Sequence, residues 1–379
     1  MSLVDDLRRL LGEELVTDNA TSLANVAIDE SALEPVTPAA LVWAESAEQV
    51  AELVRFAADR KVPVTARGAG SALEGSTIPS AGGIVLDLSR LNRVLDFWPD
   101  DLQVRVEPGV IYDQLNDYLR RGSLWFPPAP GGSSDVATIG GMVATNASGI
   151  YSVKYGGTKD FVLALEIVDG TGRSWNLGDR AVKRSSGYNL VDLLVGSEGT
   201  LGIATAITLK LRGIPEDRRQ FAFSVPDEKS AARAVSEMMK YGLDLAAVEF
   251  LDRNVIAALN QLNNYDLAER PGLFLEVHGA EPVLDAVQEA AGLLAADLGG
   301  EPLRLTSGQN PWEIRHHVTN AIKLRRPGYE ILRNDVVIPI SRLPEMVAFC
   351  EELANESGLL VHAFGHVGMG LLHALTLAR

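Results

Sequence analysis

The chain has a single cysteine among its 379 residues, Cys350, so it has no internal disulfide framework and no cysteine-ligated metal or iron–sulfur cluster. Basic residues are also few: 34 Lys and Arg stand against 50 Asp and Glu, a formal net charge of −16. This acidity disfavours nucleic acids and anionic membranes as partners, because both bind basic faces. We interpret it as a solubility feature, and we expect Cys350 to be a small, half-buried helix residue.

Signals for export or membrane insertion are weak. Residues 1–12 are acidic and amphipathic and lack the basic and apolar regions of a signal peptide. Residues 358–378 contain no Asp, Glu, Lys or Arg and are long enough to span a bilayer, but they hold four glycines and three histidines. We therefore predict buried strands and loops there. We expect a cytoplasmic location, either free or peripheral to the inner face of the membrane.

The first half of the chain mixes helices and strands without regular βαβ spacing, which favours an α+β fold. Apolar periodicity predicts helices over 3–15, 44–58 (N-cap Ser46) and 110–121. Strands are predicted over 61–66, 83–88 and 102–107, followed by a hairpin formed by 162–169 and 174–177.

A domain boundary is predicted near 213–215, where a Gly-Ile-Pro sequence precedes a charged run. Beyond it, strands alternate with helices in a pattern typical of a ferredoxin-like domain. The strands are predicted over 221–226, 246–251 and 272–278, and the helices over 229–241 and 282–298. We divide the chain into an N-terminal helical segment, 1–35, and domains over 36–214 and 215–379.

Three glycine-rich segments, 67–75, 137–149 and 196–203, are the most informative feature of the sequence. Glycines gather where the backbone turns with positive φ or approaches a ligand closely, and N–H groups in such turns can bind a pyrophosphate. The first segment is not a Rossmann motif, because Leu73 stands where the third glycine belongs, and no segment is a P-loop. The pattern predicts a large phosphate-bearing cofactor held by several loops.

Together with Pro127–Pro130 and Ser186–Leu190, these segments resemble the flavin-binding domain of the vanillyl-alcohol-oxidase/p-cresol-methylhydroxylase (PCMH) type, within it most closely the FAD-linked D-lactate and glycolate dehydrogenases. The resemblance implies a two-subdomain FAD-binding domain over 36–214 and a substrate-binding cap domain over 215–379. The first loop lacks the histidine that attaches FAD covalently in some members, so we expect non-covalent FAD. The implied FAD contacts are Arg67, Gly68, Ala69, Gly70, Ser71, Pro130, Thr138, Gly140, Gly141, Asn146, Ser148, Glu198, Gly199, Gly202 and Ile203.

Gly140 and Gly141 are expected to tolerate no side chain. A Cβ at either position would clash with the cofactor or force an unfavourable φ.

Arg315 and Thr319 are four residues apart and would share one face of a helix. An Arg fork binds a carboxylate through two parallel hydrogen bonds, and the resemblance implies that both residues hold the substrate carboxylate. From the residues alone, a solvated helix face is the alternative. Arg333, two residues before Asp335, matches a position where the family often has a basic residue; the alternative is an ordinary surface Arg.

The segment 365–373 resembles the family pattern Gly-His-x-Gly-Asp-Gly-Asn-x-His, which implies that His366 and His373 are catalytic and ligate a divalent metal such as zinc or manganese. However, Met369 replaces the Asp and Leu371 replaces the Asn. The family also continues beyond the position of Arg379 with a Glu-His-Gly element that carries the third ligand and the base. Two imidazoles make an incomplete site, because catalytic zinc normally has three protein ligands. The alternative is that both histidines are hydrogen-bonded near the flavin without a metal.

The resemblance implies oxidation of a D-2-hydroxy acid, such as D-lactate or glycolate, with a quinone, cytochrome or electron-transfer flavoprotein as electron acceptor. One alternative is a flavin-binding subunit or decayed paralogue without independent activity, in a homodimer or with a partner subunit. Another is a flavoenzyme for an aldonolactone, an alditol or a glycerolipid precursor. Because the polar groups at 369 and 371 are lost and the chain ends before the expected base, we expect the chain as given to be catalytically impaired.

Overall fold

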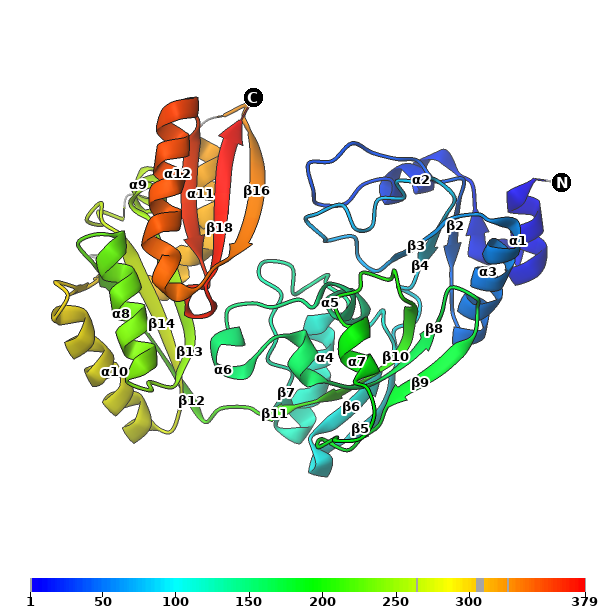
Figure 1. Cartoon of the computed structure of the whole chain (residues 1–379), viewed down its shortest axis with the longest axis horizontal. Coiled ribbons are helices and arrows are strands. Elements are labelled where there is room, and N and C mark those ends of the chain that lie inside the picture. Colours follow the sequence, from blue (N-terminus) through cyan, green and yellow to red (C-terminus); the bar gives the residue numbers. More distant parts are fainter. Residues whose placement is uncertain (1, 264, 305–309, 326, 379) are drawn as a thin grey trace. The chain divides into compact units, whose positions relative to one another are not determined.

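The computed structural model describes residues 2–263, 265–304, 310–325 and 327–378 (Figure 1). The chain forms two compact units. Unit 1 is Met1–Gly149 with Gly156–Ile214, and unit 2 is Ile150–Tyr155 with Pro215–Arg379. Both units combine helices with sheets, so the predicted α+β class is confirmed.

The first sheet of unit 1 has the strand order β1-β2-β4-β3 and presents the first glycine segment at the end of β3. Its strands are β1 (Val16–Thr17), β2 (Ala40–Trp43), β3 (Val64–Arg67) and β4 (Ile84–Asp87). Both faces of β2 and β4 are buried, one against α1 (Leu3–Leu11) and α3 (Ala47–Arg60), the other against α2 (Ala20–Val26). The helix predicted over 3–15 ends at Leu11, because Gly12 takes a φ of +109°.

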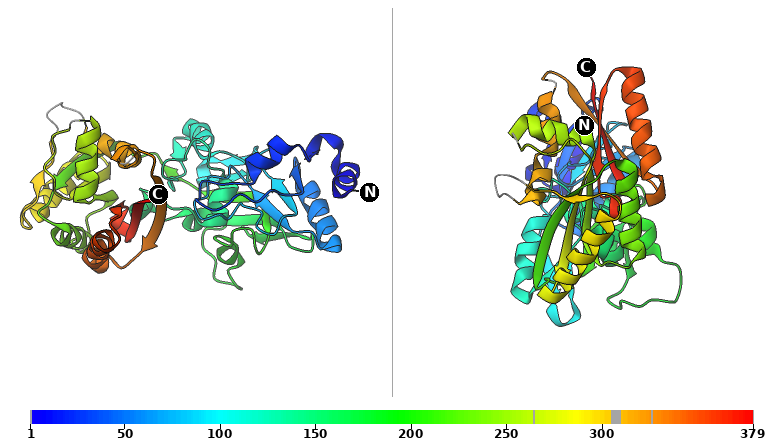
Figure 2. Two further views of the ribbon diagram at one scale, coloured as in Figure 1. Left: turned by 90° about the horizontal axis from the view of Figure 1, so that it is seen from above. Right: turned by 90° about the vertical axis from the view of Figure 1, so that its left-hand side faces the viewer.

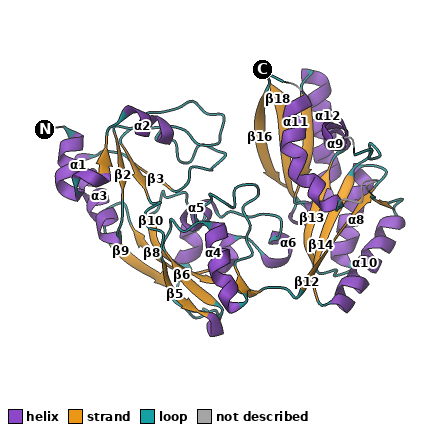
Figure 3. Cartoon of the chain, turned by 180° about the vertical axis from the view of Figure 1, so that it is seen from behind, coloured by secondary structure: helices purple, strands orange, loops and turns teal. Residues whose placement is uncertain are grey.

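The second sheet of unit 1 is antiparallel, with the order β5-β6-β10-β8-β9 (Figure 3). Its strands are β5 (Val94–Trp98), β6 (Gln103–Val106), β8 (Val162–Val168), β9 (Ser174–Gly178) and β10 (Ile203–Lys210). A small sheet joins β7 (Leu124–Trp125) to β11 (Arg212–Gly213). The helices of this part are α4 (Tyr112–Leu119), α5 (Ile139–Thr145) and α7 (Leu190–Leu194).

Unit 2 is built on one seven-stranded antiparallel sheet of order β15-β12-β14-β13-β17-β18-β16. The first four positions follow the ferredoxin-like order, with α8 (Glu228–Lys240) and α10 (Glu281–Ala296) as the connecting helices. The strands are β12 (Asp217–Ser224), β13 (Leu245–Leu251), β14 (Gly272–Gly279), β15 (Glu301–Pro302), β16 (Glu330–Val337), β17 (Leu360–Gly365) and β18 (Leu371–Ala378). The segment 150–155, which contains α6 (Ser152–Tyr155), also belongs to this unit.

Helices cover both faces of this sheet (Figures 1 and 2). On β13, Val248 and Phe250 pack with α8, α10 and α12 (Leu343–Ser357), whereas Ala247 and Leu251 pack with α9 (Arg253–Asn263) and α11 (Val318–Arg325). Because side chains alternate along a strand, Glu249 points to the same face as Ala247 and Leu251. We call this second face the α9/α11 face.

The charge-free run at 358–378 forms β17 and β18 inside the sheet, so the prediction of buried strands is confirmed. Among the described residues, no helix is both long enough and apolar enough to cross a membrane. Cys350 lies on α12 as predicted, but it is buried rather than half-buried.

Candidate functional site

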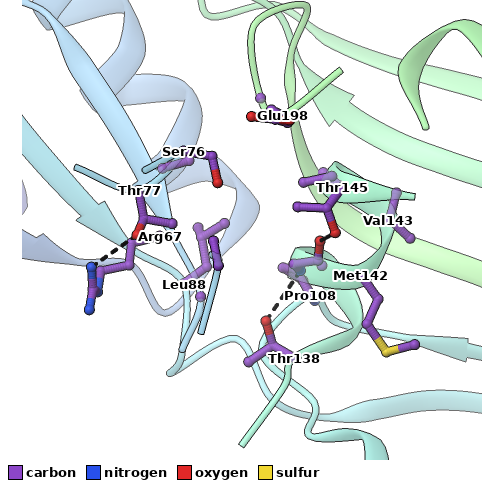
Figure 4. Close-up of a pocket in the computed structure, with 18 of the residues that line it drawn as sticks. Arg67, Ser76, Thr77, Leu88, Pro108, Thr138, Met142, Val143, Thr145 and Glu198 are labelled. Carbon is purple, nitrogen blue, oxygen red and sulfur yellow. Dashed lines mark hydrogen bonds between the residues drawn. The ribbon is translucent and has the colours of Figure 1, made fainter. Parts of the chain in front are cut away.

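A cleft that is partly open to solvent lies in unit 1 and is lined by all three glycine-rich segments (Figure 4). Every predicted cofactor residue lines it except Asn146 and Ser148. Asn146 instead ends α5 in a left-handed conformation, and its side chain accepts the N–H of Lys159 at 2.9 Å. Among the lining residues that sequence reasoning missed, Ser76, Thr77, Leu88 and Pro108 lie outside the glycine-rich segments, and Met142 and Thr145 lie inside the second segment.

The first glycine loop offers backbone donors to this cleft. Within the described part of the chain, the N–H groups from Gly68 to Ser71 have no hydrogen-bond partner. Gly70 takes a φ of +73°, and a Cβ on Gly68 would lie 2.3 Å from Thr138 Oγ1. Consecutive free N–H groups in a glycine turn suit a pyrophosphate.

The side chain of Arg67 is bonded to residues outside the loop. Its guanidinium donates to the carbonyl of Ile28 at 2.7 Å and to Thr77 Oγ1 at 3.2 Å (Figure 4). Burial lowers the pKa of Arg67, and the nearby carboxylates of Asp87 and Asp29 oppose that effect. Its charged group is therefore engaged with the protein, although the residue lines the cleft.

The second glycine segment begins α5, with Thr138 as N-cap accepting the N–H of Gly141 at 3.2 Å. A Cβ on Gly140 would lie 2.5 Å from Pro108 Cβ, whereas one on Gly141 would meet only Thr138 Oγ1, at 3.2 Å. Neither glycine has a positive φ, so the prediction that a side chain would force an unfavourable φ is wrong for both. Protein packing requires a glycine at 140, and the space in front of 141 belongs to the cleft.

The third segment is fastened to α5 by backbone hydrogen bonds. The N–H of Gly196 donates to the carbonyl of Val143 and the N–H of Glu198 to that of Ala144, both at 2.9 Å. Glu198 and Gly199 have φ values of +50° and +76°. By contrast, the preceding segment 186–190, included in the motif, is exposed throughout.

In unit 2, Arg315 and His366 meet at Glu249 on the α9/α11 face. Arg315 Nε and Nη2 donate to Glu249 Oε2 at 3.3 and 3.0 Å, and His366 Nδ1 bonds Glu249 Oε1. Burial by itself raises the pKa of Glu249, but the charges and hydrogen bonds of His366 and Arg315 outweigh burial and lower the pKa to about 2. Sequence reasoning missed Glu249, because an acidic residue inside an apolar strand gave only a break in hydrophobicity.

His373 extends this cluster. Its ring lies 5.3 Å from that of His366, nearly perpendicular to it, and its Nδ1 bonds Asp335 Oδ1 at 2.5 Å. Asp335 and His373 are directly opposed in the pairing of β16 with β18. Arg333 lies two residues before Asp335 and therefore on the same face of β16.

The predicted pairing of Arg315 with Thr319 does not arise as expected. Arg315 belongs to a 3₁₀ helix, Pro311–His317, and Thr319 to α11, which begins at Val318. The predicted spacing of four assumed one continuous α-helix, whereas a 3₁₀ helix, with about three residues per turn, gives way to α11 between the two residues. Thr319 is half-buried, and its proposed contact rests on the resemblance alone.

A second polar cluster lies on the same face, on β14. His278 Nε2 bonds Glu276 Oε1 at 2.6 Å, and Tyr155 Oη bonds His278 Nδ1 at 2.8 Å. Gln220 Nε2 donates to Glu276 Oε2 at 2.7 Å. Burial raises the pKa of Glu276, but these hydrogen bonds and nearby charges lower it overall. The cluster fastens the segment 150–155 to the sheet.

Comparisons with known proteins place this geometry in a family. Residues 38–178 match a model described as an FAD binding domain, and residues 214–379 match the C-terminal domain of FAD linked oxidases. A probable mitochondrial D-lactate dehydrogenase of Danio rerio is 35% identical over 98% of this chain and 76% of its own length. The chain belongs to the FAD-linked oxidase family of the D-lactate dehydrogenases.

Two further relatives and one solved structure are also similar to this chain. A mitochondrial D-lactate dehydrogenase (cytochrome) of Arabidopsis thaliana is 32% identical over 98% of the chain, which spans 66% of that relative's length. Glycolate oxidase subunit GlcD of Bacillus subtilis is 28% identical over 97% of the chain and 79% of its own length. A p-cresol methylhydroxylase structure shares the fold, with a TM-score of 0.81 at 17% identity, over 99% of this chain and 82% of that one.

The cleft of unit 1 fits the FAD that this family binds. The loop from Gly68 to Ser71 supplies free N–H donors, and Gly141 presents a bare backbone. Apolar side chains such as Leu165 and Ile167 line the rest.

The donors of unit 2 do not complete a metal site. Among the described residues, no group of three or more His, Cys, Asp or Glu side chains is placed to hold a metal ion. His366 and His373 direct Nδ1 to carboxylates, so each offers only Nε2. Two such nitrogens are fewer than the three protein ligands of a catalytic zinc, and no step below depends on a metal.

Proposed function

We propose that this protein oxidises a D-2-hydroxy acid to the 2-oxo acid, with D-lactate and glycolate as the first substrates to test. The meeting of Arg315 and His366 on the buried Glu249, with His373 beside His366, carries the proposal. It gathers a cation suited to a carboxylate and imidazoles suited to a hydroxyl proton on one face of one sheet. The named relatives act on, or are named for, substrates of this class.

The reaction removes a hydride from C2 and a proton from the hydroxyl oxygen. FAD, when bound, supplies the hydride acceptor at N5. Arg315 binds the substrate carboxylate, with Thr319 and Arg333 as further proposed contacts. With both Nδ1 atoms engaged by carboxylates, Nε2 of His366 or His373 is the atom that takes the hydroxyl proton.

Several finer properties belong to the same proposal. Residues 36–214 form the FAD-binding domain and 215–379 the substrate domain. FAD is bound without a covalent link, since the segment 67–75 contains no histidine. The electrons pass to a quinone, a cytochrome or an electron-transfer flavoprotein, and the protein is cytoplasmic or peripheral to the inner face of the membrane.

A second candidate is a flavin-binding subunit that needs a partner for turnover. Met369 and Leu371 favour it, because both are half-buried apolar residues between His366 and His373, the first on the turn and the second at the start of β18. The family pattern has polar side chains at both positions.

Anaerobic mixing of the FAD-loaded protein with D-lactate, glycolate, L-lactate and an alditol tests the proposal. Loss of the visible flavin absorbance with D-lactate or glycolate, but not with the alditol, is the expected result. Bleaching by the alditol alone would contradict the assignment to hydroxy acids, and a flavin that stays oxidised in every mixture would favour the subunit.

A further inference from the structure

Glu249 occupies one defined edge of the Arg315 guanidinium. Both contacts come from Nε and Nη2, the side edge of the fork, and both reach Oε2. Arg315 Cζ lies over the Trp312 ring, 5.0 Å from the ring centroid. Within the described residues, Nη1 has no hydrogen-bond partner. The end edge, Nη1 with Nη2, is therefore the edge that can take a carboxylate through two parallel bonds.

The second oxygen of Glu249 sets the orientation of His366. Oε1 bonds Nδ1, so a neutral His366 carries its proton on Nδ1 and presents a lone pair at Nε2. The perpendicular ring of His373 packs against it and limits rotation. One carboxylate thus fixes the directions of both a carboxylate binder and a proton acceptor.

The position of Glu249 is itself rigid. It lies in β13 between β14 and β17, in a run of residues that are all buried. Its side chain is 5% exposed, against 37% for Asp335, the partner of His373. An interior carboxylate on a central strand suits accurate orientation better than a surface one.

We propose that Glu249 is the positioning residue of the substrate site, presenting the end edge of Arg315 to the substrate carboxylate and the Nε2 of His366 to the substrate hydroxyl. The proposal rests on the function proposed above. It makes a specific kinetic claim. Removing the negative charge of Glu249 leaves Arg315 more attractive to an anion, so the affinity for the substrate is maintained. Arg315 and His366 both lose their alignment, so turnover falls. Misplacement by about 1 Å can cost on the order of 100-fold in rate.

The test is Glu249→Gln, with the exposed Glu351→Gln on α12 as a matched control. We expect kcat for D-lactate to fall at least about tenfold, with KM unchanged or lower, at wild-type FAD content. Wild-type kcat, or a raised KM at unchanged kcat, would overturn the proposal. If Glu249→Gln does not fold, Glu249→Asp keeps the charge but is too short to meet both partners, and the same fall in kcat is expected.

A second readout does not depend on turnover. Histidine nitrogen NMR, assigned with His366→Gln, should show the Nδ1–H tautomer of His366 in the wild type and its loss in Glu249→Gln. An Nε2–H tautomer in the wild type would overturn the proposal. If the wild type oxidises no 2-hydroxy acid yet the tautomer depends on Glu249, the proposed function fails while the positioning of His366 is supported.

Discussion

Gly140 and Gly141 are neighbours in the first turn of α5, and replacing each by Ala should give opposite results. A Cβ at Gly140 would lie 2.5 Å from Pro108 Cβ and 2.9 Å from the Pro108 carbonyl oxygen. Overpacking of this kind costs about 1–3 kcal/mol. A Cβ at Gly141 meets only Thr138 Oγ1 at 3.2 Å, and Ala is favoured over Gly in a helix by about 1 kcal/mol.

Urea unfolding of the FAD-free proteins measures the first effect. Gly140→Ala should lower the free energy of unfolding by about 1–3 kcal/mol, whereas Gly141→Ala should leave it unchanged or slightly higher. FAD titration measures the second effect: Gly141→Ala should weaken FAD binding at least about tenfold, or about 1.4 kcal/mol, because its Cβ occupies the cleft. If Gly141→Ala binds FAD as tightly as the wild type, the cofactor does not approach α5 and the reasoning is refuted.

Three further substitutions test the unit 2 assignments. Arg315→Ala removes a charge-assisted hydrogen bond worth about 1.5–3 kcal/mol, so KM for a 2-hydroxy acid should rise about ten- to a hundredfold at unchanged FAD content, and an unchanged KM would exclude Arg315 from the site. Burial, assisted by the charge of Arg325, lowers the pKa of His362 to about 4. The unfolded chain therefore takes up this proton first, and stability present above about pH 6.5 is lost as the pH falls towards about 4. Measured by urea unfolding, the loss of unfolding free energy between neutral pH and about pH 5 should be about 2 kcal/mol smaller in His362→Gln than in the wild type. An identical pH profile in the two proteins would contradict the assignment. Tyr155→Phe removes the hydrogen bond between the Tyr155 hydroxyl and the buried Nδ1 of His278 and should cost about 0.5–1.5 kcal/mol of stability; wild-type stability would show that this bond does not anchor 150–155.

The cofactor cleft could be predicted from the sequence because short glycine-rich segments form much of it. The loop with free N–H groups needs glycine at 68, where a Cβ would meet Thr138, and at 70, where φ is positive, and the bare backbone of Gly141 faces the cleft. Glycine clusters of this kind are visible in a sequence. Pro108 and Leu88 line the same cleft without any such signal, because they arrive there only through the packing of β4, β6 and α5. Strands such as β4, β8 and β14 were predicted from their apolar runs, whereas β2, β5 and β10 and the short helices α2 and α7 were not.

The cluster around Glu249 could be predicted only in part. His366 and His373 lie in one motif, but their partners Glu249 and Asp335 are 117 and 38 residues away in the chain. Only the antiparallel order β13-β17-β18-β16 brings these four residues to one face. Arg315 and Thr319 were paired on the assumption of one α-helix, but Arg315 lies in a 3₁₀ helix and Thr319 in α11.

We propose that this protein removes the C2 hydrogen of a D-2-hydroxy acid with FAD as acceptor. Anaerobic stopped-flow reduction of the flavin by D-lactate, and by D-lactate deuterated at C2, is the most direct test. Both substrates should bleach the flavin, and the deuterated one should do so several-fold more slowly. A flavin that dithionite reduces but no 2-hydroxy acid does would contradict the account, and equal rates for the two isotopologues would show that breaking the C2–H bond does not limit the reduction.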